Sequence, residues 1–286
     1  MILGHPTHLF RKVTIIGVGL IGGSLGMAIK KERLAREVMG VSRQHSSLAQ
    51  AFKNRAIDKS SHDLKKALYD ADLVVLATPV KTIIQMFATI GKSLKRGCIV
   101  MDVGSVKGAI IDAAQKNLPN HVSFVGTHPL AGSEKKGAAA GHADLFKNTV
   151  CILTPNEKTN KAALERVKNL WTKVGATAKT LSPEEHDKAL SFISHVPHLA
   201  AYALIGSIPP EYLPYSSQGL KDTTRIASSD PQMWSDISLT NTKNVLLSLD
   251  KFVKNLAAVR KSIVTKNEHH LIEIFKEAKN KRDGVA

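Results

Sequence analysis

A glycine-rich turn near the N-terminus constrains the fold more than any other feature of this 286-residue sequence. The β-branched run of residues 13–17 leads into Gly17-Val18-Gly19-Leu20-Ile21-Gly22, and residues 24–31 favour a helix. A strand, a tight glycine turn and a helix are the context in which GxGxxG binds a dinucleotide, because backbone amides at the helix start face the pyrophosphate. The sequence therefore predicts a dinucleotide site formed by Gly17, Gly19, Leu20, Ile21 and Gly22.

Short apolar segments with strand character continue along the first part of the chain. They alternate with helical stretches such as residues 82–94, and this alternation is typical of a doubly wound parallel sheet. We therefore expect a Rossmann-like α/β domain whose further strands lie at residues 37–41, 72–77, 98–103, 122–126 and 149–153.

The residues after the second expected strand favour NADP over NAD. An NAD site usually has an acidic side chain there, which binds the ribose hydroxyls. This sequence has Ser42 and Arg43 instead. Because a guanidinium matches the geometry of a phosphate, we expect both residues to bind the 2′-phosphate of NADP. An arginine that is merely solvated at the strand end is the alternative.

Near residue 182 the pattern changes from alternating strands and helices to helices only. Ser182-Pro183-Glu184-Glu185 combines a cap residue, a proline at the first helical position and an acid three residues after the cap, so a long helix is expected to begin there. The sequence predicts a dinucleotide-binding domain at residues 1–182 and an all-helical domain at residues 183–286.

The expected long helix carries a proline and three polar side chains. Pro197 lacks a backbone N–H, so it predicts a kink between His195 and His198. Ser194 and His198 are four residues apart and are expected to share one face of the helix.

An apolar stripe follows in the helical half, with spacings of three and four residues. A helical domain of about 100 residues has a limited core of its own, which favours a subunit interface over an intrachain core. The sequence therefore predicts a homodimer formed through Leu246, Leu249, Phe252, Val253, Leu256, Val259 and Ile263.

Ser105 and His128 follow expected strands, at the edge of the sheet where open α/β folds bind ligands. An enzyme that oxidises an alcohol with a nicotinamide must remove the hydroxyl proton as hydride leaves, and imidazole suits that task near neutral pH. His128 is the candidate base, and Ser105 is expected to orient it or to bridge it to the substrate hydroxyl. A structural loop histidine is the alternative. A serine hydrolase is disfavoured because the sequence has no GxSxG elbow.

A charged cluster in the helical half is a candidate carboxylate site. The guanidinium of Arg225 can bind a carboxylate through two parallel hydrogen bonds, and Lys221 lies one helical turn earlier. Asp222, between them, is expected to hold the cations in position. An ordinary surface ion pair is the alternative.

The net charge of +16 lies almost wholly in residues 1–182. No nucleic-acid module accompanies it, so we interpret it as a solubilising surface or as a field that attracts an anionic cofactor and substrate.

No apolar run approaches the roughly 20 residues of a membrane helix. The N-terminus lacks a signal pattern, and Cys98 and Cys151 lie in apolar segments without metal-ligand spacing. We expect a cytoplasmic protein with a small-molecule substrate and no metal, membrane or nucleic-acid partner.

The chain resembles the prephenate/arogenate dehydrogenase family over nearly its whole length. The resemblance rests on residues 17–23, 102–107, 128–134, 191–198 and 219–231, in that order. It implies oxidative decarboxylation of prephenate to 4-hydroxyphenylpyruvate in tyrosine biosynthesis, with hydride transfer to NADP⁺. Arogenate dehydrogenase is the alternative within the family. A β-hydroxyacid-type NADP dehydrogenase and a non-catalytic NADP sensor are less favoured alternatives outside it.

The resemblance also implies residue roles. His128 binds the ring hydroxyl with help from Ser105, and the substrate-binding residues are Ser133, Ser194, His198, Lys221 and Arg225. Because this set is neutral or cationic, we expect prephenate to be preferred over arogenate, whose ammonium group requires a carboxylate; Glu134 is an acid that weakens this expectation. The family dimerises through its helical domain. Since the sequence ends soon after that part, we expect no C-terminal regulatory domain.

Overall fold

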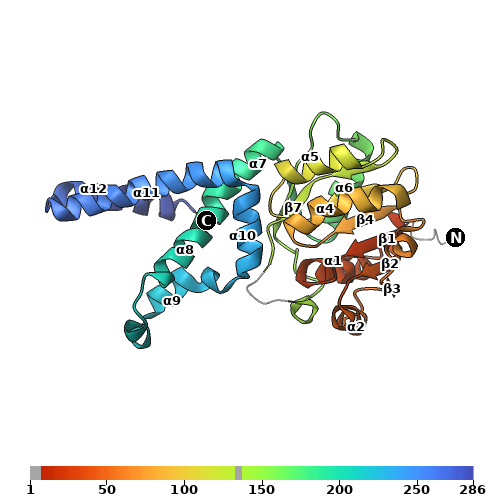
Figure 1. The fold of residues 1–286 in the computed structure, drawn as a ribbon, viewed down its shortest axis with the longest axis horizontal. Coiled ribbons are helices and arrows are strands. Elements are labelled where there is room, and N and C mark those ends of the chain that lie inside the picture. The colour runs from red at the N-terminus through yellow and green to blue at the C-terminus, as the bar shows by residue number, and fades with distance from the viewer. Residues whose placement is uncertain (1–7, 133–136, 286) are drawn as a thin grey trace, which may run out of the picture.

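The computed structural model describes residues 8–132 and 137–285 as an α/β domain joined to an elongated helical domain (Figure 1). Six parallel strands form the main sheet, in the order β3-β2-β1-β4-β5-β6. This Rossmann-like sheet confirms the predicted fold class, and it adds the short, polar β3, which the sequence did not indicate. The strands are β1 (Phe10–Ile16), β2 (Ala35–Val41), β3 (Lys59–Ser61), β4 (Leu73–Leu76), β5 (Ile99–Asp102) and β6 (Ser123–Val125).

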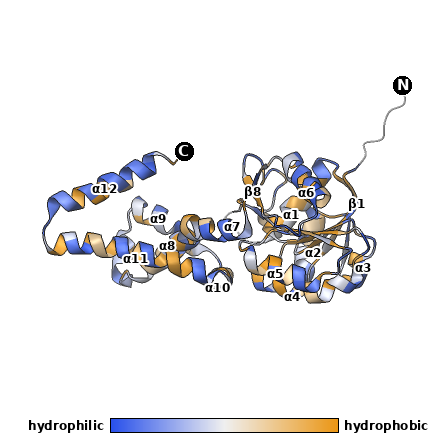
Figure 2. Ribbon diagram, turned by 90° about the horizontal axis from the view of Figure 1, so that it is seen from above, coloured by the Kyte–Doolittle hydropathy of each residue, from blue (hydrophilic) through white to orange (hydrophobic). Residues whose placement is uncertain are grey.

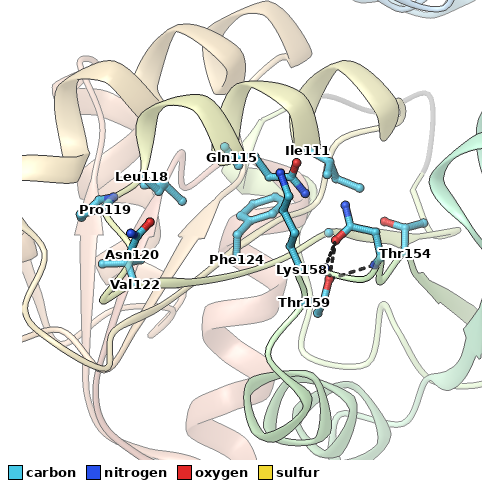
Figure 3. Close-up of a pocket in the computed structure, with 13 residues that line it drawn as sticks. Ile111, Gln115, Leu118, Pro119, Asn120, Val122, Phe124, Thr154, Lys158 and Thr159 are labelled. Atoms are coloured by element: carbon cyan, nitrogen blue, oxygen red, sulfur yellow. Dashed lines mark hydrogen bonds between the residues drawn. The ribbon is translucent and has the colours of Figure 1, made fainter.

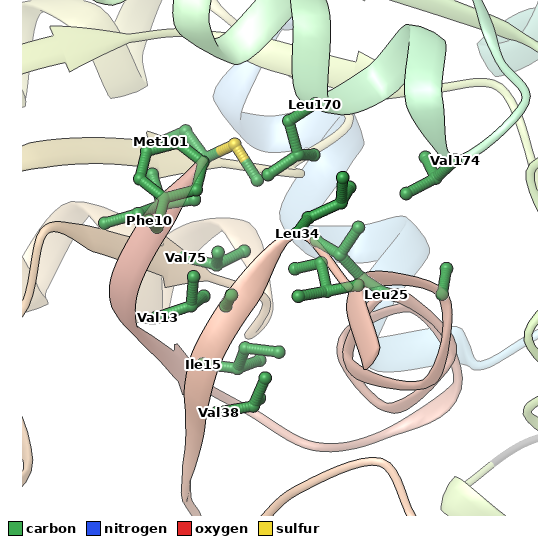
Figure 4. Close-up of a cluster of buried hydrophobic side chains, with 14 of the residues drawn as sticks. Phe10, Val13, Ile15, Leu25, Leu34, Val38, Val75, Met101, Leu170 and Val174 are labelled. Carbon is green, nitrogen blue, oxygen red and sulfur yellow. The ribbon is translucent and has the colours of Figure 1, made fainter. Parts of the chain in front are cut away.

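Helices cover both faces of this sheet (Figure 2). Successive strand residues point to opposite faces, so Val13 and Ile15 of β1 belong to one buried cluster and Ile16 to another. The first cluster lies under α1, α2 and α6 (Figure 4), and the second under α3, α4 and α5. The helices are α1 (Leu20–Lys31), α2 (His45–Lys53), α3 (Leu64–Leu68), α4 (Val80–Ile90), α5 (Gly108–Asn117) and α6 (Lys161–Lys173).

A second, three-stranded sheet corrects one expectation. Residues 149–153 were expected to extend the parallel sheet, but β8 (Val150–Leu153) pairs antiparallel with β7 (Thr127–Pro129) and parallel with β9 (Thr177–Thr180). The chain leaves the first sheet at Gly126, whose carbonyl accepts a hydrogen bond from Thr154 N–H at 2.9 Å. A Cβ atom at Gly126 would lie 2.5 Å from Thr154 Oγ1, so a side chain would disturb this junction.

From Pro183 onward the described chain is helical. The predicted capping box is confirmed: Ser182 Oγ accepts from Glu185 N–H at 3.1 Å, and Glu185 Oε2 accepts from Ser182 N–H at 3.0 Å. The helices are α7 (Pro183–Leu190), α8 (Val196–Gly206), α9 (Gln218–Thr224), α10 (Pro231–Thr240), α11 (Thr242–Val264) and α12 (Glu268–Asp283).

The irregularity that Pro197 predicts is present, but it lies earlier than the expected position between His195 and His198. A π-helical turn, Ser191–His195, joins α7 to α8. Because proline lacks an N–H and its ring collides with the carbonyl four residues before it, the regular ladder is disturbed on its N-terminal side.

The combined run Pro183–Gly206 also revises an expectation from the sequence. Among the described residues it is long and apolar enough, by length and composition, to cross a membrane, a test that core helices also pass. The apolar residues of this run belong mostly to α8, in which Val196 and Ala201 are buried in the single chain.

The predicted apolar stripe lies on α11, which leads away from the α/β domain and is followed by α12 (Figure 2). Much of the stripe is solvent-exposed in the single chain, including Leu246 at 52%, Leu256 at 57% and Ile263 at 60%. A row of exposed apolar side chains of this kind marks an interaction surface.

Candidate active site

The predicted strand, glycine turn and helix are confirmed. Gly17 has a φ of +95°, and a Cβ atom there would lie 2.4 Å from the carbonyl oxygen of Ala77. A Cβ atom at Gly22 would lie 1.9 Å from the carbonyl oxygen of Gly17. Glycine is therefore required at both positions, because any side chain would push the turn away from β4 or α1 away from the turn.

The start of α1 fits a pyrophosphate. Gly19 is the N-cap, so no side chain caps the first turn, and that turn carries no acid. A Cβ atom at Gly19 would meet no described atom within 4 Å, so there is open space beside the turn. The first-turn amides of Leu20, Ile21 and Gly22 can face an anion there, in the position where dinucleotide sites bind the diphosphate.

Ser42 and Arg43 lie next to this turn, because Gly17 N–H donates a hydrogen bond to the carbonyl of Val41, the last residue of β2, at 2.9 Å. Ser42 Oγ accepts from Gln44 N–H at 3.1 Å, and the Arg43 side chain is exposed. Position 43 can therefore reach a group bound at the end of β2.

Two histidines that the sequence analysis missed adjoin the same strand end. His62 Nδ1–H donates to the carbonyl of Ser42 at 2.9 Å, and His62 Nε2 lies 3.1 Å from His45 Nδ1. Their ring centroids are 4.1 Å apart. His62 follows the unexpected β3, so no local pattern indicated that it would reach Ser42.

His128 lies in the middle of β7, where its ring joins a chain of three polar side chains. His128 Nδ1 lies 2.9 Å from His186 Nε2, and His186 Nδ1 lies 2.9 Å from Asp187 Oδ1. His186 and Asp187 are on α7 of the helical domain and were not singled out from the sequence. Their only sequence signal is an adjacent His–Asp pair in the first turns of the capped helix.

A buried ion pair positions the strand that carries His128. Asp102, at the end of β5, pairs with Lys107, and both side chains are completely buried. Lys107 Nζ also donates to the carbonyl of Thr127 at 2.8 Å, and the Thr127 hydroxyl donates to the carbonyl of Asp102. The segment 102–107 is thus anchored to the residue before His128.

Burial holds the pKa of His128 well below its ordinary value, and nearby His186 and Lys107 lower it further. A histidine with a lowered pKa is neutral at neutral pH, so His128 is ready to accept a proton. Its Nδ1 is occupied by His186. Because His186 makes the orienting contact on Nδ1, Nε2 is left for Ser105 or a substrate hydroxyl. Ser105 lies half-buried in the turn after β5.

A cavity of about 510 Å³ opens beside His128. It is bounded by β7 and the residues after it, and by the π-helical turn, with Leu130, Leu190, Ile193 and Ser194 on its walls. Its size is that of a small-molecule site. The structure thus brings His128 and Ser194 together, although they come from different domains.

His198 is held one turn beyond Ser194. Its Nδ1–H donates to the carbonyl of Ser194 at 2.9 Å, which confirms that the two residues share a helix face. Its ring stacks on Trp234, with centroids 3.6 Å apart. Burial lowers the pKa of His198, and the nearby Arg225 cation lowers it further, so the neutral ring presents Nε2 as an acceptor.

Lys221 and Arg225 are exposed on α9 and on the following short helical turn. Neither of them is among the described residues that line the cavity beside His128, and Ser105 and His198 are absent from that lining as well. Asp222 accepts a hydrogen bond from Gln218 at 2.8 Å. Ser133 and Glu134 lie outside the described residues.

A second cavity, of about 470 Å³, lies between α5 and the loop after β8 (Figure 3). Phe124, Thr154 and Lys158 line it, but no described residue of the predicted site does. Within the described ranges, no group of three or more His, Cys, Asp or Glu side chains is placed to bind a metal ion. Both cysteines are buried.

Comparison with known proteins assigns both domains. Residues 25–180 match the family described as prephenate dehydrogenase, nucleotide-binding domain, and residues 182–277 match prephenate dehydrogenase, dimerization domain.

Individual relatives agree with these matches. The chain is 36% identical to prephenate dehydrogenase of Bacillus subtilis, covering 96% of this chain and 76% of the relative, and 37% identical to cyclohexadienyl dehydrogenase of Zymomonas mobilis, covering 96% of each. The Aquifex aeolicus prephenate dehydrogenase complex with hydroxyphenyl propionate and NAD⁺ superimposes with a TM-score of 0.89 at 35% identity, covering 96% of this chain and 98% of that chain. The chain therefore belongs to the prephenate dehydrogenase family.

Proposed function

We propose that this protein is an NADP-dependent prephenate dehydrogenase that forms 4-hydroxyphenylpyruvate in tyrosine biosynthesis. The observation that carries the proposal is the neutral His128, which faces a small-molecule cavity and has its Nδ1 already bonded to His186. A base of this kind, in a domain with a glycine turn suited to a dinucleotide, is what dehydrogenation of an alcohol requires.

His128 performs the proton transfer. The ring hydroxyl of prephenate donates its proton to Nε2 of His128, and Ser105 bridges or supports this contact. When bound, the nicotinamide would supply the acceptor for the hydride that leaves the carbinol carbon. Loss of CO₂ from the opposite ring position leaves its bonding electrons to the ring, which becomes aromatic, and His128 returns the proton to the phenolate oxygen. His128 is thereby restored to its neutral form.

The remaining candidate residues bind the substrate. Ser194 contacts it from the cavity wall. Ser133 is a further contact in this proposal, and Lys221 and Arg225 of the helical domain attract its carboxylates. These cations favour prephenate, which carries two carboxylates and no amine. Arogenate is the second candidate because the neutral His198 offers Nε2 as an acceptor for an ammonium group.

Ser42 and Arg43 bind the 2′-phosphate in this proposal. The end of β2 has no acid at these positions and lies next to the glycine turn, which supports NADP. NAD⁺, the cofactor bound in the Aquifex aeolicus relative, is the alternative.

We also propose a homodimer that acts in the cytoplasm. The exposed apolar stripe on α11 and the family's description of the second domain support the dimer. The two buried, free cysteines suit a reducing compartment, and the net charge of +16 suits an anionic substrate and cofactor.

One assay tests this function. Initial rates of nicotinamide reduction are measured with prephenate, arogenate and a 3-hydroxy acid, each with NADP⁺ and NAD⁺. We expect the highest kcat/KM for prephenate with NADP⁺. A tenfold or greater preference for arogenate would contradict the substrate assignment. Oxidation of the 3-hydroxy acid alone would indicate the β-hydroxyacid class, and NADP⁺ binding without turnover of any substrate would indicate a sensor.

A further inference from the structure

His128, His186 and Asp187 form a continuous hydrogen-bonded chain across the junction of the two domains. The two links, His128 Nδ1 to His186 Nε2 and His186 Nδ1 to Asp187 Oδ1, each measure 2.9 Å. His186 has 0% of its surface exposed and Asp187 has 6%. In such a buried place each link needs one donor and one acceptor, because an unmatched polar pair is costly.

Asp187 determines the direction of the chain. Its Oδ1 accepts from the backbone N–H of Lys107 at 2.8 Å, and its Oδ2 accepts from the N–H of Gly108 at 2.9 Å, at the start of α5. Hydrogen bonds from His186 and from these amides hold its pKa below the ordinary value against the effect of burial. An ionised carboxylate only accepts hydrogen bonds, so the proton in the second link resides on His186 Nδ1.

The rest of the chain follows from that proton. Burial lowers the pKa of His186, so the ring is neutral and its Nε2 carries a lone pair. That lone pair accepts the Nδ1–H of His128. We propose that His186 and Asp187 are positioning residues that keep the proton of His128 on Nδ1, so that the Nε2 lone pair faces the cavity as the base. This inference rests on the role proposed above for His128.

The same pair connects the base to the docking of the two domains. His128 belongs to β7 of the α/β domain, whereas His186 and Asp187 belong to α7 of the helical domain. The Asp187 carboxylate binds the start of α5, and its backbone carbonyl accepts from Asn241 Nδ2 at 2.8 Å. When His128 takes a proton on Nε2, its Nδ1–H remains bonded to His186, and the Asp187 carboxylate stabilises the new charge. Only a docked helical domain supplies this arrangement.

Two substitutions at position 186 test the inference. Glutamine at 186 has an amide that can donate to Asp187 and an oxygen that can accept from His128 Nδ1–H, so His186→Gln preserves both links. His186→Leu has neither group. We expect kcat with prephenate to fall about a hundredfold or more in His186→Leu and to stay within about tenfold of the wild type in His186→Gln, with the KM for prephenate changed little in either.

A domain-docking control separates positioning from structure. Asp236 on α10 pairs with Lys81 on α4 at 2.9 Å, and so joins the same two domains away from His128. Asp236→Asn should leave kcat close to the wild-type value. If Asp236→Asn lowers kcat as much as His186→Leu does, or if His186→Gln is as impaired as His186→Leu, the inference is overturned.

A spectroscopic measurement keeps this test independent of catalysis. In nitrogen-15 NMR spectra of histidine-labelled protein, with His128→Asn used to assign the signals, we expect His128 to carry its proton on Nδ1 in the wild type and in His186→Gln. In His186→Leu this preference should be lost. A wild-type His128 protonated on Nε2 would overturn the inference even if the enzyme is active. An inactive wild type with the proton on Nδ1 would instead contradict only the proposed function.

Discussion

Arg43 is the side chain on which the choice of cofactor depends most. It is exposed at the end of β2, beside the glycine turn. Arg43→Ala should weaken NADP⁺ binding by about 1.5–3 kcal/mol, the contribution of a charge-assisted hydrogen bond, and leave NAD⁺ binding nearly unchanged. Titration with both cofactors measures this difference. Arg36→Ala, an exposed arginine earlier in β2, is the control. Equal or better use of NAD⁺ by the wild type would contradict the prediction.

Single residues differ in how far the sequence revealed them. His128 could be predicted because it follows a strand at the ligand-binding edge. His186 and Asp187 could not, because their importance comes from a contact with a residue 58 positions earlier that only the docked domains create. The sequence pattern around them indicates a helix start, and this explains the capping box but not the buried pair.

The unit formed by β1, the glycine turn and α1 permits a prediction at the level of elements. Gly22→Ala should destabilise the protein by about 1–3 kcal/mol, because its Cβ atom would collide with the Gly17 carbonyl. Gly19→Ala should cost less, about 1 kcal/mol at most, because its Cβ atom would face open space and only the N-cap preference for glycine over alanine is lost. It should nevertheless weaken cofactor binding about tenfold or more, because the methyl group occupies the approach to the backbone.

Chemical denaturation and cofactor titration of the two variants measure both quantities. A Gly19→Ala protein that binds NADP⁺ as tightly as the wild type would show that the cofactor does not approach the turn.

The elements that the sequence predicted are those with buried apolar runs, such as β4, whose four residues are all buried. The missed strands β3, β7 and β9 are each three or four residues long and contain mainly polar residues, so they show no periodic pattern. They form because a neighbouring strand offers hydrogen-bonding groups. Residues 149–153 were correctly predicted as a strand but wrongly assigned to the parallel sheet, because tertiary structure decides which strands pair.

At the scale of the whole molecule, the exposed stripe on α11 predicts the oligomeric state. Leu256→Glu would place a charge in an apolar subunit interface, so we expect a monomer where the wild type has twice the 31.0 kDa of the single chain. Light scattering on a sizing column measures the mass. Lys254→Glu adds the same carboxylate on another face of α11 and should leave the dimer intact. A dimeric Leu256→Glu protein would contradict the predicted interface.

Buried histidines with lowered pKa values make the free energy of unfolding depend on pH. Burial lowers the pKa of His195 to about 4, while the unfolded chain titrates near pH 6.5. Between these values the unfolded state binds the extra proton and the folded state does not, so stability falls as the pH is lowered. His195 alone contributes a loss of about 3 kcal/mol between pH 6.5 and pH 4. The lowered pKa values of His128 and His186 act in the same direction.

Denaturant unfolding at a series of pH values measures this loss. His195→Asn keeps an acceptor for Asn241 but does not titrate, so its stability should decline less steeply. A decline as steep as that of the wild type would show that His195 is not responsible.

The most direct measurement is the turnover number of His128→Asn with prephenate and NADP⁺. Asparagine keeps a polar side chain at position 128 but cannot accept the hydroxyl proton. We predict that kcat falls by about 10² to 10⁴ while the dissociation constant of NADP⁺ stays unchanged, because His128 acts on the substrate and not on cofactor binding. A His128→Asn enzyme whose kcat remains within a few-fold of the wild type would contradict the account.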